Sequence, residues 1–299
     1  MSQHSGERIG FLGLGIMGSR MAANVLGAGF PLTVWTHTPG KAARWASDHG
    51  CEAAGTPAEV AERSDIVVSM VVDGEQVASV LLGAGGVIEA ARDGLLCVDM
   101  STIAPPDTRR IGAELAGRGV RMLDAPVTGS SPRAQDASLT IMVGGEAEHF
   151  ARARPLLETM GSLIRHVGKL GQGETLKLIN NALGAANAAA VAEALLLAEA
   201  TGIDIDALVE IVSSGSGGSA QLALKAGAMR DHDFTPLFKT AHMLKDVRLC
   251  LEEAQTAGVP FPAAAHARDL LTATMSRGHA EDDYASLIEA AEGLAGRRL

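Results

Sequence analysis

Short apolar runs alternate with helix-like patterns through the first half of the chain. Apolar side chains fill most positions of these runs, which is typical of parallel strands that are covered on both faces. The runs are Arg8–Leu12, Pro31–Trp35, Asp65–Val71, Leu95–Met100, Val120–Asp124, Leu139–Gly145 and Leu163–Val167. Strands separated by helical segments predict an open, mostly parallel α/β sheet.

The second half of the chain has the spacing of helices only. One long helical pattern extends from Glu174 to about Thr201 and ends at a glycine. Asp204 or Asp206 is placed to cap the next helix, and the serines and glycines of residues 213–219 predict a tight turn between helices. Further helical segments are expected after Phe234–Phe238, at Pro262–Arg277 and at Glu281–Leu294.

These patterns predict a mostly parallel α/β domain followed by an all-α domain that begins with a long helix. We place the domains at residues 1–170 and 171–299. A chain of 299 residues is long enough for each domain to bury its own core. Hydrophobic residues make up 47% of the chain but aromatic residues only 3%, so both cores are expected to be mostly aliphatic.

Charge and cysteine usage narrow the classes of partner. The formal net charge of −10 argues against nucleic acid and means that an anionic substrate needs a local basic pocket. Cys51, Cys97 and Cys250 show no CxxC spacing, which indicates a reduced protein without a disulfide framework or metal site. The N-terminus lacks an apolar signal region, and the apolar stretch Ala182–Ala200 is interrupted by polar residues. We therefore expect a cytoplasmic protein without a membrane partner.

A glycine-rich turn follows the first predicted strand. It reads Gly13, Leu14, Gly15, Ile16, Met17 and Gly18, and a helical pattern begins directly after it. In G-x-G-x-x-G the first glycine permits the tight turn, the second lets a pyrophosphate approach, and the third packs the helix on the strand. The six residues therefore predict a dinucleotide site, and the alternative is a glycine-rich turn without a ligand.

The residues after the second predicted strand indicate which dinucleotide the site would prefer. A free ribose 2′-hydroxyl usually meets an acidic residue there, but this strand continues into Thr36, His37, Thr38 and, after a turn, Lys41, with no carboxylate before Asp48. Without an acidic residue a 2′-phosphate is not repelled, and these side chains offer it donors. We therefore predict NADP in preference to NAD. The alternative is that His37 and Lys41 are solvated loop residues.

Other strand ends supply further candidates, because ligands of open α/β sheets bind outside the carboxyl ends of the strands. The turns Val71–Val72 and Ser101–Thr102 are expected to border the cofactor. Alternatively, Thr102 is a capping or turn hydroxyl before the helix that the following prolines open. The hydroxyl-rich loop Thr128–Ser130, after the strand that ends at Asp124, offers donors for a carboxylate or a carbonyl oxygen.

A lysine and an asparagine stand at the start of the long helix. Lys177 and Asn181 are four residues apart, so a helix places them on one face. Their neighbours are apolar, and an amine that loses hydration gives up its proton more easily. Lys177 is thus a candidate for proton transfer, and the alternative is an ordinary exposed lysine.

Four motifs together resemble the β-hydroxyacid dehydrogenase family, which includes 3-hydroxyisobutyrate dehydrogenases and tartronate-semialdehyde and glyoxylate/succinic-semialdehyde reductases. The motifs are Gly13–Gly18, Asp124–Gly129, Gly171–Asn181 and Lys245–Asp246. The resemblance covers nearly the whole chain. It implies an α/β Rossmann-like dinucleotide-binding domain followed by an all-α domain, joined by a long interdomain helix. It also implies hydride transfer between NAD(P) and a small 3-hydroxyacid, semialdehyde or 2-oxo acid at the junction of the domains.

The resemblance also implies roles for residues. Lys177 would be the general acid or base, assisted by Asn181. It implies substrate contacts at Thr128, Gly129, Ser130, Phe238 and Asp246, and cofactor contacts at Thr102 and Lys245. It further implies a homo-oligomer, a dimer or tetramer.

This sequence departs from the family's usual pattern in two places. The substrate loop has Thr128-Gly129-Ser130 where Ser-Gly-Gly is usual, with an additional cation at Arg133. The segment Thr36–Thr38 stands where NADP-using members often have Asn-Arg-Thr.

Two alternatives remain open from the sequence. An imine reductase has the same architecture but usually carries aspartate or tyrosine where Lys177 stands. A dinucleotide-binding relative without turnover is expected to lose the lysine or the substrate loop.

Overall fold

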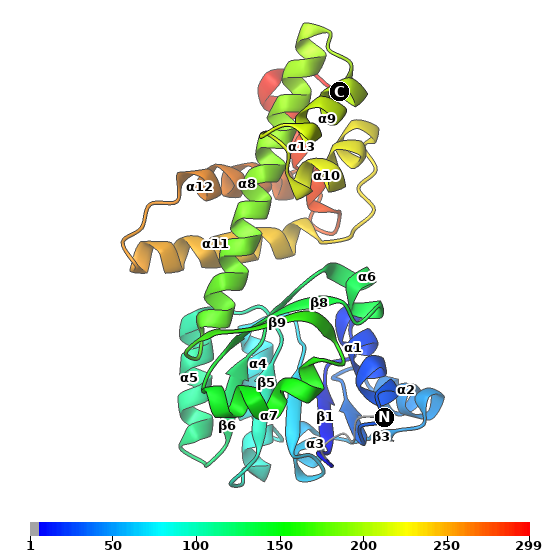
Figure 1. Ribbon diagram of the computed structural model, residues 1–299, viewed down its shortest axis with the longest axis vertical. Helices are drawn as coiled ribbons and strands as arrows, with labels where there is room; N and C mark the ends of the chain where they lie inside the picture. Colours follow the sequence, from blue (N-terminus) through cyan, green and yellow to red (C-terminus); the bar gives the residue numbers. More distant parts are fainter. Residues whose placement is uncertain (1–5) are drawn as a thin grey trace. The chain divides into compact units, whose positions relative to one another are not determined.

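The computed structural model describes residues 6–299, which divide into two compact units after Lys177, the second being Leu178–Leu299. The first unit is a Rossmann-like α/β domain and the second is entirely helical, which confirms the predicted fold class (Figure 1). Each unit has its own hydrophobic core.

The first unit is built on one sheet of nine strands. Their order is β3-β2-β1-β4-β5-β6-β8-β7, and β9 pairs with β8. The strands are β1 (Ile9–Leu12), β2 (Leu32–Trp35), β3 (Glu52–Ala53), β4 (Ile66–Ser69), β5 (Leu96–Asp99), β6 (Arg121–Asp124), β7 (Val127–Thr128), β8 (Leu139–Gly144) and β9 (Gly161–Gly168). The strands from β3 to β6 pair in parallel, whereas β8 is antiparallel to β6 and β7. All seven expected strands are present, and the two-residue strands β3 and β7 were not expected.

Helices cover the two faces of this sheet over separate apolar clusters. The helical segments are α1 (Ile16–Gly27), α2 (Lys41–His49), α3 (Pro57–Glu62), α4 (Gly74–Leu82), η1 (Val87–Ala90), α5 (Pro105–Ala116), α6 (Ser130–Gln135) and α7 (Ala147–Leu157). Thr56 and Asp73 cap α3 and α4 through their side chains, which satisfies backbone N–H groups that the first turn leaves unpaired. The central strands β4 and β5 are buried along their full length, as their continuous apolar sequences predict.

The predicted loop Thr128–Ser130 is wrong at its last residue, because Ser130 already begins α6, a helix that the sequence pattern does not predict. Gly129 and Ser130 both have positive φ, +135° and +58°, and redirect the chain into the helix. Ala134 is fully buried, and its carbonyl oxygen accepts a hydrogen bond from Asn24 Nδ2 at 2.8 Å. Packing against α1 therefore overrides the polar local sequence.

The strand ends form a level row at one edge of the sheet. In the register of β1, β4, β5 and β6, Leu12 pairs with Ser69, Ser69 with Asp99, and Asp99 with Asp124. Because these strands are parallel, the loops that follow them leave from the same edge. The glycine turn and the segments after β4, β5 and β6 all begin there.

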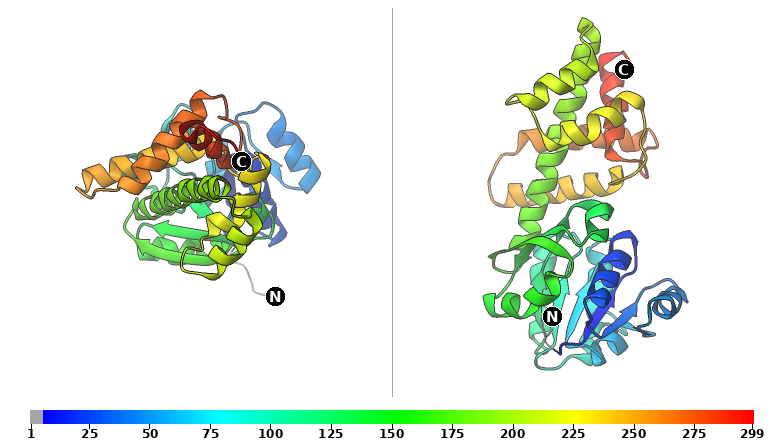
Figure 2. Two further views of the ribbon diagram at one scale, coloured as in Figure 1. Left: turned by 90° about the horizontal axis from the view of Figure 1, so that it is seen from above. Right: turned by 45° about the vertical axis from the view of Figure 1, so that its right-hand side comes forward.

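The second unit consists of helices around an aliphatic core. The segments are α8 (Gln172–Thr201), which begins in the first unit, α9 (Ile205–Ser214), α10 (Ala220–Asp231), α11 (Thr240–Thr256), α12 (Pro262–Ser276), η2 (Tyr284–Ser286) and α13 (Leu287–Ala295). The helices α11 and α12 lie side by side (Figure 2). Asp204, and not Asp206, caps α9, and Ser219 caps α10 after the predicted tight turn.

The last helical segment starts later than the sequence suggests. A helix was expected from Glu281, but residues 281–283 are not helical, and a 3-10 turn precedes α13. The Asp283 carboxylate explains this difference, because it accepts backbone hydrogen bonds from Leu237, Phe238 and Ala285. A helical conformation at Asp283 would compete with this arrangement.

Among the described helices, α8 is the one whose length and apolar composition would allow it to cross a membrane. The apolar window of this helix is 56% buried, and its alanines and leucines form a large part of the second core. Core helices of soluble proteins have the same properties, so we interpret α8 as a core helix, as the interrupted apolar pattern predicts.

Candidate active site

The turn between β1 and α1 is shaped for a pyrophosphate. Gly13 has a φ of +106°, and a Cβ atom there would lie 2.3 Å from the Met70 carbonyl oxygen. A Cβ atom at Gly18 would lie 2.0 Å from the Gly13 carbonyl oxygen, so neither position accepts a side chain. Nothing lies within 4 Å of a Cβ atom at Gly15, and Gly15 is the N-cap of α1 without a capping side chain. The first N–H groups of α1 therefore fit an anion such as a dinucleotide's phosphates.

The other three residues of the turn have different environments. Leu14 is buried in the core, Met17 packs against it, and Ile16 is 66% exposed at the start of α1. Leu14 and Met17 thus anchor the turn, and Ile16 lies on its open side.

The end of β2 is joined to this turn, since Gly13 N donates to the Trp35 carbonyl oxygen at 2.8 Å. Beyond Trp35, Thr36 is half-buried and His37 and Thr38 are exposed. Lys41 opens α2 behind Gly40, whose φ is +72°. The segment presents hydroxyl, imidazole and ammonium groups beside the glycine turn and no carboxylate.

One buried carboxylate connects the loops after β4 and β5. Asp99 Oδ1 accepts hydrogen bonds from Ser69 Oγ at 2.8 Å and Ser101 Oγ at 2.7 Å. Ser101 Oγ in turn accepts one from Val71 N at 3.0 Å. The segments Val71–Val72 and Ser101–Thr102, both predicted to border the cofactor, are therefore fixed to each other.

Thr102 is not the N-cap residue of α5. The N-cap position of α5 is Ala104, which has no side-chain capping bond. Thr102 is half-buried two residues earlier, directly after the Asp99 network. Thr102 therefore lies in the loop between β5 and α5.

A second buried carboxylate joins β6 to α8. Asp124 Oδ1 accepts a hydrogen bond from Gly171 N at 2.8 Å, and Oδ2 accepts one from Glu174 N at 2.8 Å. The first turn of α8 is thus held at the same sheet edge as the glycine turn. Lys177 follows three residues after Glu174 and is only 6% exposed, so it is not an ordinary surface lysine.

In the helical unit, three more predicted residues lie together. Asn181 Nδ2 donates to Asp246 Oδ2 at 2.6 Å, and Lys245 Nζ lies 3.2 Å from Asp246 Oδ1. Asn181 is 6% exposed and Asp246 is 1% exposed. Phe238 precedes α11 and makes edge contacts with the rings of His242 and Tyr284. The structure therefore groups Asn181, Lys245 and Asp246, and places Phe238 among neighbouring aromatic rings.

The predicted substrate loop has unusual backbone geometry. Thr128 ends β7, and Gly129 and Ser130 have positive φ before α6 begins. A side chain at Gly129 would collide with that of Arg133, with Cβ atoms 2.7 Å apart. All three residues of the loop are half-buried.

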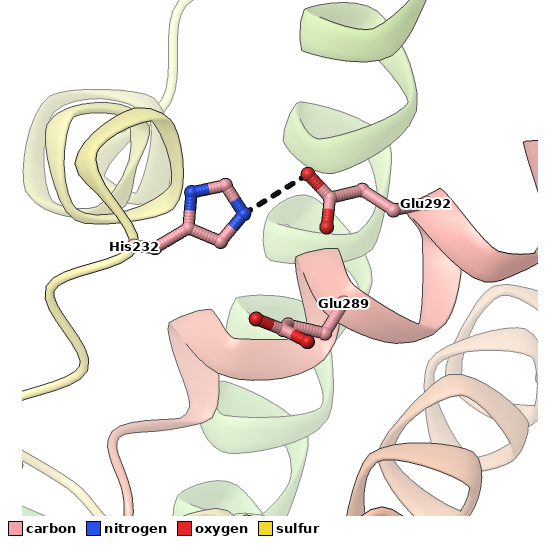
Figure 3. Close-up of side chains that lie close together, drawn as sticks. All are labelled: His232, Glu289 and Glu292. Carbon is pink, nitrogen blue, oxygen red and sulfur yellow. Dashed lines mark hydrogen bonds and ion pairs between the residues drawn. The ribbon is translucent and has the colours of Figure 1, made fainter. Parts of the chain in front are cut away.

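A group of possible metal ligands lies elsewhere in the helical unit. His232, Glu289 and Glu292 bring their ligand atoms within 4.8 Å of one another (Figure 3). His232 Nε2 already binds Glu292 Oε1 at 3.0 Å, and Leu299 N donates to the same oxygen at 2.8 Å. Arg298 lies 3.7 Å from Glu289. We interpret the group as an ion-pair cluster that holds the C-terminal segment.

Two buried aspartates at strand ends belong to the site and were not predicted as parts of it. Asp99 was considered only as part of the strand Leu95–Met100, and Asp124 only as the end of a strand and the first residue of a family motif. Their common signal is a carboxylate at the last position of an otherwise apolar strand, which burial makes unfavourable unless donors surround it.

Comparisons with known proteins agree with this architecture. A family model for the NAD binding domain of 6-phosphogluconate dehydrogenase matches residues 8–168. A second model, for the NAD-binding region of NADP-dependent 3-hydroxyisobutyrate dehydrogenase, matches residues 171–291. The chain is 37% identical to 2-hydroxy-3-oxopropionate reductase of Escherichia coli, over 98% of this chain and 99% of that one.

Solved structures give the same result. The 3-hydroxyisobutyrate dehydrogenase of Mycobacterium tuberculosis, with L-serine, superimposes with a TM-score of 0.87 at 33% identity, over 96% of this chain and 99% of that one. An imine reductase from Myxococcus stipitatus reaches a TM-score of 0.60 at 20% identity, over 96% of this chain and 100% of that one. This second likeness concerns the fold alone.

Proposed function

The chain belongs to the β-hydroxyacid dehydrogenase family of NAD(P)-dependent oxidoreductases, and we propose that it interconverts a small semialdehyde or 2-oxo acid and the corresponding hydroxyacid with Lys177 as general acid and base. The observation that carries this proposal is the burial of Lys177 at 6% exposure on a helix whose first turn is fixed at the sheet edge with the glycine turn. A buried amine at that edge is suited to proton transfer.

A bound nicotinamide dinucleotide would supply the hydride for reduction or accept it in oxidation. Gly13, Gly15 and Gly18 and the first turn of α1 would hold its pyrophosphate. In reduction, protonated Lys177 gives its proton to the forming alkoxide oxygen, and in oxidation the neutral amine takes it back. Before transfer, the ammonium group stabilises the developing negative charge.

Asn181 and the substrate loop would support this chemistry. Asn181 follows Lys177 by one helical turn, and its amide is oriented by the bond from Nδ2 to Asp246. The side-chain oxygen of Asn181 is an acceptor of the kind that an ammonium group requires. Thr128, Gly129 and Ser130 would hold the anionic end of the substrate.

NADP is the proposed cofactor. Thr36, His37, Thr38 and Lys41 lie after β2, which is joined to the glycine turn, and none of them is acidic. A 2′-phosphate would therefore meet donors and no fixed negative charge. We expect a lower KM for NADP than for NAD, and the reverse order would favour NAD.

The function is tested with a panel of small hydroxyacids, semialdehydes and cyclic imines, each with NADP and NAD. We expect turnover of a carboxylate-bearing aldehyde or keto acid and none of the imines. In Lys177→Ala, turnover should fall by about 10²–10⁴-fold, the range of general acid–base catalysis, while dinucleotide binding persists. Lys169→Ala removes an exposed lysine eight residues earlier and should turn over like the wild type. Wild-type turnover in Lys177→Ala would remove the lysine from the chemistry.

We further propose a cytoplasmic homo-oligomer. The described cysteines are free, and burial raises the pKa of the Cys97 thiol to about 12 and that of Cys250 to about 11, which suits a reducing compartment. Leu197 is 65% and Leu294 79% exposed beside an apolar hollow of about 430 Å³, and a second copy could cover them. Light scattering should give a multiple of 30.7 kDa; a monomer would contradict the proposal.

A further inference from the structure

Helix α8 begins without a capping side chain of its own, because a glycine, Gly171, precedes its first residue. The backbone N–H groups of Gly171 and Glu174 are instead bound by the two oxygens of Asp124, 47 and 50 residues earlier in the sequence. A carboxylate at a helix N-terminus also interacts favourably with the helix dipole. Asp124 thus acts as a cap supplied by a distant strand.

The space around this carboxylate is closed by two further glycines. A Cβ atom at Gly144, on β8, would lie 2.3 Å from Asp124 Oδ1, and one at Gly173 would lie 2.8 Å from Oδ2. Asp124 itself is fully buried. The aspartate of one motif and the glycine pair Gly171 and Gly173 of another are therefore parts of one structural device.

This device lies close to the proposed catalytic amine. Lys177 follows Glu174 by three residues, so a rise of about 1.5 Å per residue puts their Cα atoms about 4.5 Å apart along the helix axis. Fixing the Glu174 N–H group therefore fixes the position of the turn that carries Lys177 along the axis of α8 and its rotation about that axis. Misplacement of a reacting group by about 1 Å lowers rates about 10²-fold.

We propose that Asp124 is a positioning residue for Lys177: its carboxylate anchors the first turn of α8 to the end of β6 and thereby sets the place of the catalytic amine. This proposal rests on the function proposed above for Lys177. It assigns Asp124 no contact with the substrate, and its effect on catalysis passes through the lysine.

The test is a double-mutant cycle with Asp124→Asn and Lys177→Ala. The asparagine keeps one acceptor oxygen and turns an N–H₂ group toward the other backbone N–H, so one of the two anchoring bonds is lost. We expect kcat to fall about tenfold or more in Asp124→Asn, with unchanged dinucleotide affinity. In the Lys177→Ala background the same change should have no further effect on kcat, because the two residues act as one unit.

Asp204→Asn is the matched control, since Asp204 caps α9 through a bond of 2.8 Å to Ala207 N. The asparagine keeps an acceptor oxygen for this N–H group and removes only the negative charge at the helix N-terminus, so this variant should have the wild-type kcat. Hydrogen exchange should be faster in residues 171–177 of folded Asp124→Asn and unchanged there in the control. If Asp124→Asn folds too poorly to assay, Asp124→Ser is smaller than the aspartate, lacks the second oxygen that binds the other N–H group and should show the same pattern.

The outcomes separate the two proposals. An active Lys177→Ala would overturn the proposed function whatever Asp124 does. An inactive Lys177→Ala together with wild-type kcat in the Asp124 variants, or equal losses of kcat in both backgrounds, would overturn the positioning role alone.

Discussion

At the scale of single residues, the site depends on carboxylates that are buried and surrounded by donors. Asp99 is fully buried, and its Oδ2 atom has no hydrogen-bond partner in the described structure. Burial raises the pKa of Asp99 to about 6, hydrogen bonds from Ser101 and Ser69 oppose the rise, and the neighbouring Asp124 adds to it. The folded protein therefore favours the protonated form of Asp99 compared with the unfolded chain.

This shift predicts a pH-dependent stability. The pKa of Asp99 in the folded state lies above its usual value of 3.8. Protonation of Asp99 therefore stabilises the folded protein, and this stabilisation is complete below pH 3.8. It is lost as pH rises through about 6. Asp99→Asn mimics the protonated acid at every pH and therefore does not lose this stabilisation. From pH 4 to pH 7 the free energy of unfolding of the variant should rise by about 3 kcal/mol relative to that of the wild type. Urea unfolding across this range measures the difference.

Asp233→Asn is a control of opposite sign, because hydrogen bonds from Thr235 lower the pKa of the exposed Asp233. The charged form of Asp233 stabilises the folded protein above the usual pKa. The free energy of unfolding of Asp233→Asn should therefore fall relative to that of the wild type as pH rises. A difference between Asp99→Asn and the wild type that does not vary with pH would show that Asp99 has an ordinary pKa.

At the scale of elements, the β1–α1 unit shows why two glycines of one helix have different importance. Gly18 is the third helical residue of α1, and a Cβ atom there would collide with the Gly13 carbonyl oxygen. Gly27 ends the same helix, and nothing lies within 4 Å of a Cβ atom there. The close contact between α1 and the turn therefore requires a glycine at position 18 but not at position 27.

We therefore expect Gly18→Ala to displace the turn and weaken NADP binding at least tenfold, since the pyrophosphate depends on its backbone. Gly27→Ala should leave binding unchanged and stabilise the protein by about 0.5–1 kcal/mol, the usual gain of alanine over glycine in a helix. Calorimetric titration and thermal unfolding measure both effects. Equal NADP affinity in the two variants would contradict the role given to Gly18.

Local patterns predicted the elements that have local causes. The glycine turn, the apolar strands and the long helix α8 depend on neighbouring residues, so the sequence indicates them directly. The two-residue strands β3 and β7 are too short to have a pattern, and α6 depends on packing of Ala134. The bonds from Gly171 and Glu174 to Asp124 span 47 and 50 residues, and no periodicity indicates such a pairing.

The candidate site was predictable to a similar degree. Lys177 was identified from its neighbours and from the family motif, and the structure adds that it is buried. The roles of Lys177, Asn181 and the cofactor contacts stay predictions. Asp246 came from resemblance alone, because its bond to Asn181 joins residues 65 positions apart.

At the scale of the whole molecule, the two units have separate cores and separate buried charges. In the helical unit, Lys225 Nζ binds Asp283 Oδ1 at 2.7 Å and lies 4.4 Å from the centre of the Tyr284 ring. Lys225 is 4% and Asp283 2% exposed. Asp283 also fixes the backbone before α11, so this pair joins α10, the segment before α11 and η2.

Lys225→Met should therefore destabilise the helical unit by about 3–5 kcal/mol, because it leaves Asp283 buried without its cation. Lys239→Met, which removes a more exposed pair with Glu281, should cost less than about 1 kcal/mol. Hydrogen exchange at neutral pH should rise in α10, α11 and η2 of Lys225→Met, while β1, β4 and β5 keep wild-type protection and NADP affinity is retained. Equal loss of protection in both units would show that the whole chain unfolds as one cooperative body.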